Sequence, residues 1–254
     1  MFPFDIKNLG ASFKRYFEIV PALSETLRDH AFRIRHEVYC EELGFEPLRA
    51  DGRERDRYDA QSLHCLIRSL NTGQFVGCTR LILCRAEAPN EPLPFERTCA
   101  ASLDRRIVDP QALARERIAE VSRLAVVSSF RLRRDEHKSP VPLNEQTFGS
   151  WLRPRFPYIP VALYLATTEL AAMNGIDQMF VLTDPRLAAH FARLGVTVRQ
   201  IGSPVEHRGL RVPSMLDVQD ILRSLNFIMR PLYEEVAQEV HRAMEQRGLA
   251  LSPN

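Results

Sequence analysis

The chain has 254 residues, of which 45% are hydrophobic and 26% charged, and its formal net charge is +2. This length allows a full hydrophobic core in one large or two small domains. The near-neutral charge argues against a general nucleic-acid-binding protein, so nucleic acid is not an expected partner.

The sequence carries neither a membrane-span pattern nor an export signal. No run of about 18 apolar residues occurs, and the N-terminus lacks the pattern of a signal peptide. The five cysteines are scattered and odd in number, with no C-x-x-C pair, which argues against a disulfide framework and against a metal site. We therefore expect a cytoplasmic protein without a bound metal.

Strand and helix patterns alternate in the first half of the chain. Residues 13–20 are expected to form a strand. A helix is expected from Ser24 to a stop at Gly44, because apolar residues recur at helical spacing between them. Further strand patterns follow at residues 64–70 and 74–84, which form a hairpin, and at 118–127.

The apolar patterns in the second half of the chain predict alternating helices and strands. The patterns predict helices at 161–175 and 185–195, strands at 178–184 and 196–202, and a helical tail over 217–248. A mixed sheet with helices on both faces satisfies this order. We expect an α/β domain over residues 1–215 and a C-terminal helical extension over 216–254, packed on that domain or on a second subunit.

Two polar clusters lie in the first third of the chain. Arg35 and Tyr39 are one helical turn apart and are followed by Phe45. Asp56 and Asp59 lie in a charged loop, where such a pair can clamp an amine or an arginine. For both clusters an ordinary solvated surface is the alternative interpretation.

Charged residues also interrupt two strands that are otherwise apolar. Arg80 lies in the middle of such a strand, so it needs a carboxylate partner, for which Asp56 and Asp59 are candidates. A period of two places Glu120 and Ser122 on one sheet face and Arg123 on the other. Such a pair can hold an amine and accept its proton; a structural ion-pair network with Arg80 is the alternative.

A basic segment follows directly after the last of these strands. Phe130 is followed by Arg131, Arg133 and Arg134. Three guanidinium groups suit a phosphate or an acidic protein, and a solvated basic loop is the alternative.

In this order and spacing, the clusters resemble a known family. The pattern R-x-x-x-Y, G-F-E, D-x-x-D, G-x-x-R-L and E-x-S-R-L-A-V is similar to that of the acyl-homoserine-lactone (autoinducer) synthases of the GCN5-related N-acetyltransferase (GNAT) superfamily. The segment IGSPVEHRG, residues 201–209, resembles the PEP-CTERM/exosortase system-associated acyltransferases, which are similar to N-acyl amino acid synthases. The resemblance covers roughly residues 33–213.

The resemblance implies a GNAT-like fold with a mixed, mostly antiparallel twisted sheet, and transfer of an acyl group from a thioester to an amine. Glu120, Ser122, Arg123 and Arg80 would carry the catalysis, with Glu120 as the base. The residues expected to bind substrate are Arg35, Tyr39, Phe45, Asp56 and Asp59, with the backbone N–H groups of Ala125 and Val126 for the oxyanion. Phe130, Trp151, Leu163 and Phe180 are expected to line an acyl pocket.

The sequence departs from the family at two points. Phe45 stands where the autoinducer synthases usually have tryptophan, and the glycine-rich loop of the superfamily is absent from the segment after Val126. Without that loop, Arg131, Arg133 and Arg134 are expected to bind the phosphopantetheine and the acidic surface of an acyl carrier protein. Coenzyme A is the alternative donor, and no tightly bound cofactor is expected.

Three functions stay open. The first is an N-acyltransferase that uses an amino acid or a similar small amine. The second is an autoinducer synthase that uses S-adenosylmethionine. The third is a non-catalytic protein that binds an acyl ligand.

Overall fold

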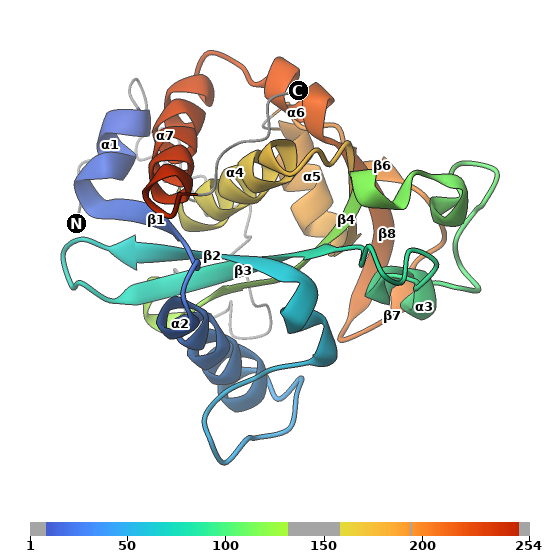
Figure 1. Ribbon diagram of the computed structural model, residues 1–254, viewed down its shortest axis with the longest axis horizontal. Coiled ribbons are helices and arrows are strands. Elements are labelled where there is room, and N and C mark those ends of the chain that lie inside the picture. Colours follow the sequence, from blue (N-terminus) through green and yellow to red (C-terminus); the bar gives the residue numbers. More distant parts are fainter. Residues whose placement is uncertain (1–8, 132–157, 194, 249–254) are drawn as a thin grey trace.

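A twisted sheet of eight strands forms the centre of the protein in the computed structural model, which describes residues 9–131, 158–193 and 195–248 (Figure 1). The strand order is β1-β2-β3-β4-β5-β8-β6, and β7 pairs with β8. Only β4 and β5 run parallel, so the expected mixed, mostly antiparallel sheet is confirmed. The strands are β1 (Phe17–Pro21), β2 (Ser62–Ser69), β3 (Phe75–Leu83), β4 (Ile118–Val126), β5 (Gln178–Thr183), β6 (Arg199–Gln200), β7 (Val205–Glu206) and β8 (Leu210–Asp217).

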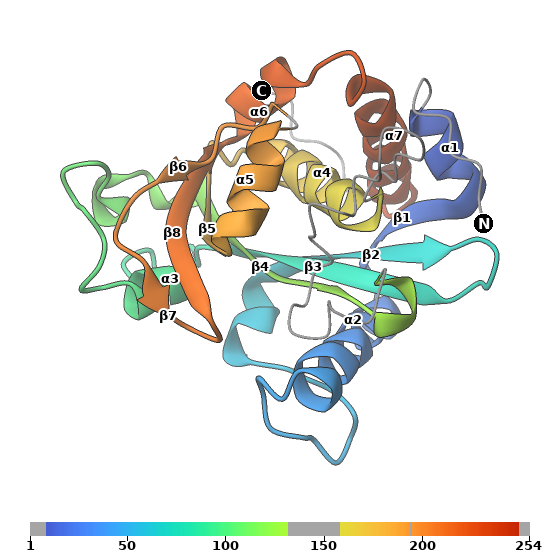
Figure 2. The same ribbon diagram turned by 180° about the vertical axis from the view of Figure 1, so that it is seen from behind.

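Helices cover both faces of this sheet, as the sequence predicts. Helix α2 lies on one face, while α4, α7 and α1 lie on the opposite face, with α7 between α4 and α1 (Figures 1 and 2). Helix α4 is buried along almost its whole length between the sheet and α7, which explains its uniformly apolar sequence. The helices are α1 (Leu9–Tyr16), α2 (Glu25–Arg35), α3 (Pro94–Thr98), α4 (Tyr158–Met173), α5 (Pro185–Arg193), α6 (Val218–Ser224) and α7 (Arg230–Gln246).

The N-terminal elements differ from the prediction at one point. The strand expected over residues 13–20 is wrong in its first half, because helix α1 continues to Tyr16. Leu9, Phe13 and Tyr16 are buried at helical spacing, whereas a strand would have exposed alternate apolar residues. The next helix begins as expected, with Ser24 capping α2, and it ends through a π-helical turn (His36–Glu42) before Gly44 at φ 62°.

The C-terminal half contains a strand that the sequence analysis missed. The strand expected over 196–202 is reduced to β6, and the partner of β5 is β8. Pro213 argues against a strand in the sequence, yet its carbonyl accepts a hydrogen bond from Ile201 N–H within the sheet. The helical tail expected over 217–248 is divided into two helices. Between α6 and α7, the side-chain oxygen of Asn226 accepts hydrogen bonds from the backbone N–H groups of Ile228 and Met229, which interrupts the helix.

A bulge in β4 shapes the region where the expected site residues lie. Ser122 pairs with Arg80 and Ala125 pairs with Cys78, so β4 has one residue more than β3 between these two pairs. Arg123, within the bulge, has a left-handed backbone with φ 54°. The pairing of β4 with β5 reaches Val121 and Val181 and goes no further. The two strands therefore part just where the bulge begins.

Helix α7 belongs to the packed core of the described chain, and strand β8 crosses the position expected for the domain boundary. Leu232 of α7 is fully buried, whereas Gln238 on the same helix is exposed. We expect Leu232→Ala to lower the free energy of unfolding by about 2–5 kcal/mol, because truncation leaves a cavity. Gln238→Ala serves as the control and should change it by less than about 0.5 kcal/mol. Denaturant unfolding measures both; equal small losses would contradict tight docking of α7.

Candidate active site

A cavity of about 460 Å³ opens where β4 and β5 part. Val121 and Val181, whose side chains belong to the core under α4, line it from one sheet face. Glu120 and Leu182 line it from the other face. The cavity therefore connects the two faces of the sheet through the gap between the strands.

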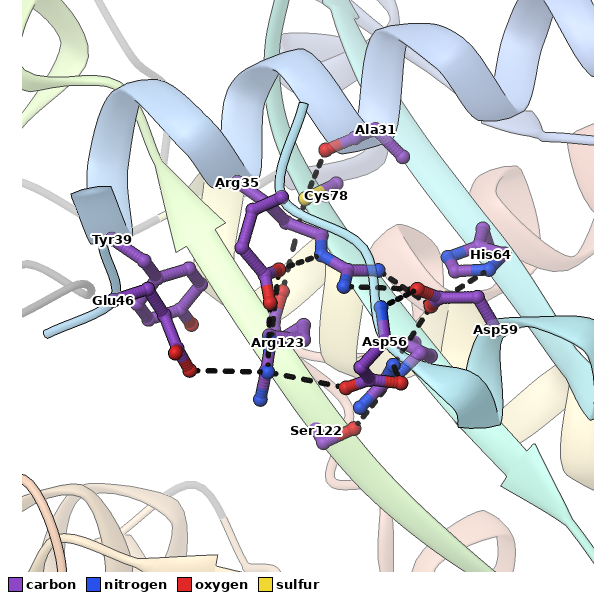
Figure 3. A network of polar contacts seen from close by, with 12 residues as sticks. Ala31, Arg35, Tyr39, Glu46, Asp56, Asp59, His64, Cys78, Ser122 and Arg123 are labelled. Carbon is purple, nitrogen blue, oxygen red and sulfur yellow. Dashed lines mark hydrogen bonds and ion pairs between the residues drawn. The ribbon is translucent and has the colours of Figure 1, made fainter. Parts of the chain in front are cut away.

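Arg35 is the centre of a buried ion network beside the cavity (Figure 3). Its side chain is fully buried on α2. Its Nε donates to Glu54 at 2.5 Å, and its Nη1 donates to Asp59 at 2.6 Å. Arg35 thus ties α2 to the acidic segment that runs ahead of β2.

Arg80 has the carboxylate partners that the sequence predicts. Its Nη1 donates to both Asp56 and Asp59, each at 2.7 Å. Its Nε donates to the hydroxyl of Ser122 at 3.0 Å. Ser122 is therefore part of the ion network, as the alternative interpretation proposed.

The side chain of Arg123 does not follow the predicted alternation. A regular strand would place Arg123 and Ser122 on opposite faces, but the left-handed backbone at Arg123 turns its guanidinium into the same network. Arg123 donates to Glu54 at 2.9 Å and to Asp56 at 3.2 Å, and it approaches Glu46 at 3.4 Å. The prediction of opposite faces is wrong because of the bulge.

Two carboxylates of this network, those of Glu54 and Asp59, are held ionised. Burial acts to raise the pKa of Glu54, but the hydrogen bond from Arg123 and the charge of Arg35 outweigh it and lower that pKa to about 2. Burial likewise opposes the shift at Asp59, where Arg35 and Arg80 hold the pKa far below its ordinary value. The network is therefore a fixed arrangement of paired charges near neutral pH.

Glu120 has a different environment from the other acids. It is buried and lies across from Ile82 on β3 and Phe180 on β5. Its Oε2 accepts a hydrogen bond from the backbone N–H of Phe95 at 2.8 Å, and Phe95 stacks on Phe180 at 4.5 Å. Burial in this apolar setting raises the pKa of Glu120 to about 7. A carboxyl with this pKa can exchange a proton at neutral pH.

Tyr39 and Phe45 also line the cavity. The hydroxyl of Tyr39 donates to the backbone carbonyl of Leu124 at 3.0 Å, and the guanidinium of Arg123 lies over its ring. The π-helical turn that carries Tyr39 is thereby fastened to the bulge.

Other expected substrate residues lie behind the cavity wall. Ala125 and Val126 are buried against β3, and the cavity lining on β4 ends at Leu124. Phe130 packs edge-on against Phe17 at 6.5 Å. Leu163 and Phe180 are fully buried core residues, and Trp151 lies outside the described residues. The apolar lobe of the cavity is lined instead by Tyr164, Phe191, Val198 and Leu216.

Arg131 is the one member of the basic segment that lies within the described residues. It is buried and forms an ion pair with Glu42, at the end of the π-helical turn. This pair joins the end of β4 to the helix that carries Arg35 and Tyr39. Arg133 and Arg134 lie outside the described residues.

Three residues of the site were missed by the sequence analysis. Glu54 bridges Arg35 and Arg123, and Glu46 bridges Arg123 and Arg208. Glu46 and Glu54 lie in the G-F-E and acidic segments already noted, but nothing in either segment indicates which acid faces inward. Arg208 comes from the loop between β7 and β8, far away in sequence.

Metal-site and membrane-span geometries are both lacking in the described part of the chain. No group of three or more His, Cys, Asp or Glu side chains there is arranged to hold a metal ion. No helix within the same residues has the length and apolar content needed to cross a bilayer.

Comparisons with known proteins agree with this architecture. Residues 34–137 match the family model described as an acetyltransferase (GNAT) domain. An acyl-homoserine-lactone synthase of Rhizobium radiobacter is 26% identical over 173 residues, which make up 68% of this chain and 69% of the relative.

Two solved structures illustrate the shared fold. TofI, in a ternary complex with an inhibitor and MTA, has a TM-score of 0.56 at 22% identity, with 80% of this chain and 91% of that chain covered. FeeM, an N-acyl amino acid synthase from uncultured soil microbes, has a TM-score of 0.53 at 16% identity, with 84% and 97% covered. Together, the matched domain, the homologous synthase and the shared fold identify the chain as an acyltransferase with a GNAT-like fold, homologous to the acyl-homoserine-lactone synthases.

Proposed function

We propose that the protein transfers a fatty acyl group from an acyl carrier protein thioester to the amine of an amino acid or a similar small molecule. The observation that carries this proposal is the cavity through the sheet. Glu120, with a pKa near 7, faces it on one side, and the apolar residues Tyr164, Phe191 and Leu216 line its other end. An amine and an acyl chain can thus approach the same point from opposite faces.

In the proposed reaction the amine attacks the thioester carbonyl directly. The new C–N bond forms, the C–S bond breaks, and the carrier leaves as a thiol. Glu120 takes the proton that the amine loses, directly or through water, and the same proton is then passed to the departing sulfur, so that the carrier leaves as a thiol. Because Ala125 and Val126 lie behind the cavity wall, backbone N–H groups of β4 between Val121 and Leu124, where the strand has no β5 partner, would stabilise the developing oxyanion in their place. Supporting roles of Arg80, Ser122, Arg123, Arg35, Asp56 and Asp59 would be to hold Tyr39, Phe45 and β4 in place.

An autoinducer synthase that uses S-adenosylmethionine is an equally supported alternative. It is favoured by the Rhizobium radiobacter relative, which is an acyl-homoserine-lactone synthase. The amino acid acceptor is favoured by the fold shared with FeeM and by the segment of residues 201–209, which resembles the exosortase-associated group. The products distinguish the two functions: an N-acyl amino acid in one case, an acyl lactone in the other.

The carrier protein as donor, the cytoplasm as compartment and an exosortase context also belong to this proposal. Two structures of similar fold, BjaI and MesI, are of enzymes described as CoA-dependent, so coenzyme A stays the alternative donor. Residues 216–254 would serve as a helical extension of the acyltransferase domain, with a homodimer as a further option.

Substitution of Glu120 tests the proposed base. Glu120→Gln keeps the shape and burial of the side chain but cannot accept a proton, so acyl transfer should fall by about 10²–10⁴-fold while the protein stays folded. Mass spectrometry of lipid extracts from cells that express each form would show the product only with the native residue. Undiminished acyl transfer by Glu120→Gln would refute the assignment.

A change in the ion network provides the contrast to that variant. Arg80→Ala removes one cation from each of the partly buried Asp56 and Asp59, which keep Arg123 and Arg35, so it should cost about 1.5–3 kcal/mol of stability. Loss of stability here, with retention of stability in Glu120→Gln, would separate structural from chemical roles.

The raised pKa of Glu120 predicts the pH profile. The base form exists above the pKa of about 7, so kcat/KM should rise with pH up to that value and then level off. Because the pKa of Glu120 is higher in the folded protein than in the unfolded chain, protonated Glu120 stabilises the fold. This stabilisation is complete below pH about 4.5 and is lost as pH rises through about 7. Glu239 has a raised pKa of about 7 as well, so activity is the decisive measurement. A profile that is flat between pH 5 and 8 (roughly the window around that pKa) would contradict the role.

Charge reversal tests the carrier protein as donor. The double change Arg133→Glu and Arg134→Glu should raise the KM for acyl carrier protein by about tenfold or more, most strongly at low ionic strength. Arg131 is left unchanged because it pairs with Glu42. Arg199→Glu with Arg223→Glu, both exposed, is the control of equal charge. If both double variants have the same KM, the basic segment is not the docking site.

A further inference from the structure

The loop between β7 and β8 is built around an arginine in a strained conformation. His207, Arg208 and Gly209 connect β7 to β8, and Arg208 has φ 55° next to Gly209 at φ 91°. Glycine adopts the left-handed region readily, Asn and Asp less so, and a long side chain such as arginine rarely. A residue held in this region often marks a functional site.

This loop forms part of the cavity wall. His207, Arg208 and Arg211 all line the cavity. Arg208 forms an ion pair with Oε1 of Glu46, and Arg123 approaches the same oxygen at 3.4 Å. The loop is thereby linked through one carboxylate to the bulge of β4, next to the reactive part of the cavity.

The carboxylates on the cavity wall are already paired with cations or N–H groups, whereas two N–H groups of Arg208 are not hydrogen-bonded to any described residue. Glu54 and Asp56 are paired with Arg123, and Asp184 lies 3.3 Å from Arg211. Among the described residues, Glu46 is the only acid within ion-pair distance of Arg208, and it contacts Nη2 alone. No hydrogen bond joins Nε or Nη1 of Arg208 to another described residue, so these groups can bind a ligand, and an anion suits a guanidinium edge best.

The charges around His207 are also consistent with an anion-binding site at Arg208. Burial lowers the pKa of His207, and the charges of Arg208, Arg123 and Arg211 lower it further, against an opposing effect of Glu46. At His207 the charges of the three arginines thus outweigh that of Glu46, which is the setting that an anionic group on a ligand requires.

We propose that Arg208, supported by Arg211, binds the carboxylate of the acceptor and so restricts the enzyme to amines that carry one. This inference rests on the proposed acyl transfer, and it holds for a free amino acid and for S-adenosylmethionine alike, since both have an α-carboxylate. The amine would then be the group left to meet Glu120, the one acid of the cavity wall that is paired with a backbone amide instead of a cation. Arg208 thus determines specificity, while Glu120 accepts the proton.

An acceptor competition tests the proposal. The enzyme is given acyl carrier protein loaded with medium and long acyl chains. The acceptor mixture contains the common amino acids, the amines that remain when each loses its carboxylate, and S-adenosylmethionine with its decarboxylated form. Mass spectrometry of the acylated products gives the preference for carboxylate-bearing acceptors, which we expect to be at least about tenfold.

Arg208→Asn is the informative variant, because asparagine tolerates the left-handed backbone and removes the charge. It should reduce that preference by at least about tenfold, because a higher KM lowers kcat/KM for the carboxylate-bearing acceptor more than for the matching amine. Arg208→Lys should retain part of the preference. Arg199→Asn, an exposed change that loses the same charge, should leave the preference as it is.

The possible results distinguish failure of the carboxylate site from failure of the acyl-transfer function. If the native enzyme acylates both members of a pair equally, or if Arg208→Asn lowers both equally, the carboxylate site is refuted while acyl transfer stands. If no acceptor is acylated with either a carrier protein or a coenzyme A donor, the proposed function itself fails.

Discussion

The left-handed backbone at Arg123 is the constraint on which the site depends. In a regular strand Arg123 would face away from Ser122, and the acids of the loop before β2 would lack one of their cations. The bulge turns the guanidinium toward Glu54 and Asp56, and it lies where β4 leaves β5. One irregularity therefore both completes the ion network and lies at the opening of the cavity.

The network and Glu120 are neighbours with opposite electrostatics. Within the network every acid has a guanidinium partner, and Glu54, Asp56 and Asp59 each have two, so removal of one arginine leaves these acids partly compensated. Glu120 faces Ile82 and Phe180 and has only the amide of Phe95. Desolvation without a close cation is what keeps its pKa near 7, whereas the pKa of Glu54 falls to about 2. The arginines hold the architecture, and the acid they leave unpaired is the one suited to proton transfer.

The parts that sequence reasoning predicted are those with a strong local physical reason. An arginine in an apolar strand must be paired, and Arg80 meets both acids expected for it. Ser24 and Gly44 mark the ends of a helical region by their capping chemistry. The parts that were missed depend on contacts distant in sequence: the bulge at Arg123, the strand that contains Pro213, and the pairing of Glu46 with Arg208 across 162 positions. Periodicity carries no information about such contacts. The sequence therefore predicts Phe130 and Leu163 as lining residues of the acyl pocket, whereas the apolar lobe of the cavity is lined by Tyr164 and Phe191.

The two halves of the cavity come from different parts of the chain. Residues 34–137, which match the GNAT domain, contain the ion network and Glu120. The apolar lobe and the loop with Arg208 come from residues 158 onward, including α4, α5 and β8. These contributions meet in the gap between β4 and β5 and at the ion pair of Arg208 with Glu46. In the proposed reaction, changes in the later segment would alter which acyl chain and which acceptor enter. The part of the chain that matches the GNAT domain thus contains the proposed base, and the part that follows contains the proposed contacts to the acyl chain and to the acceptor carboxylate.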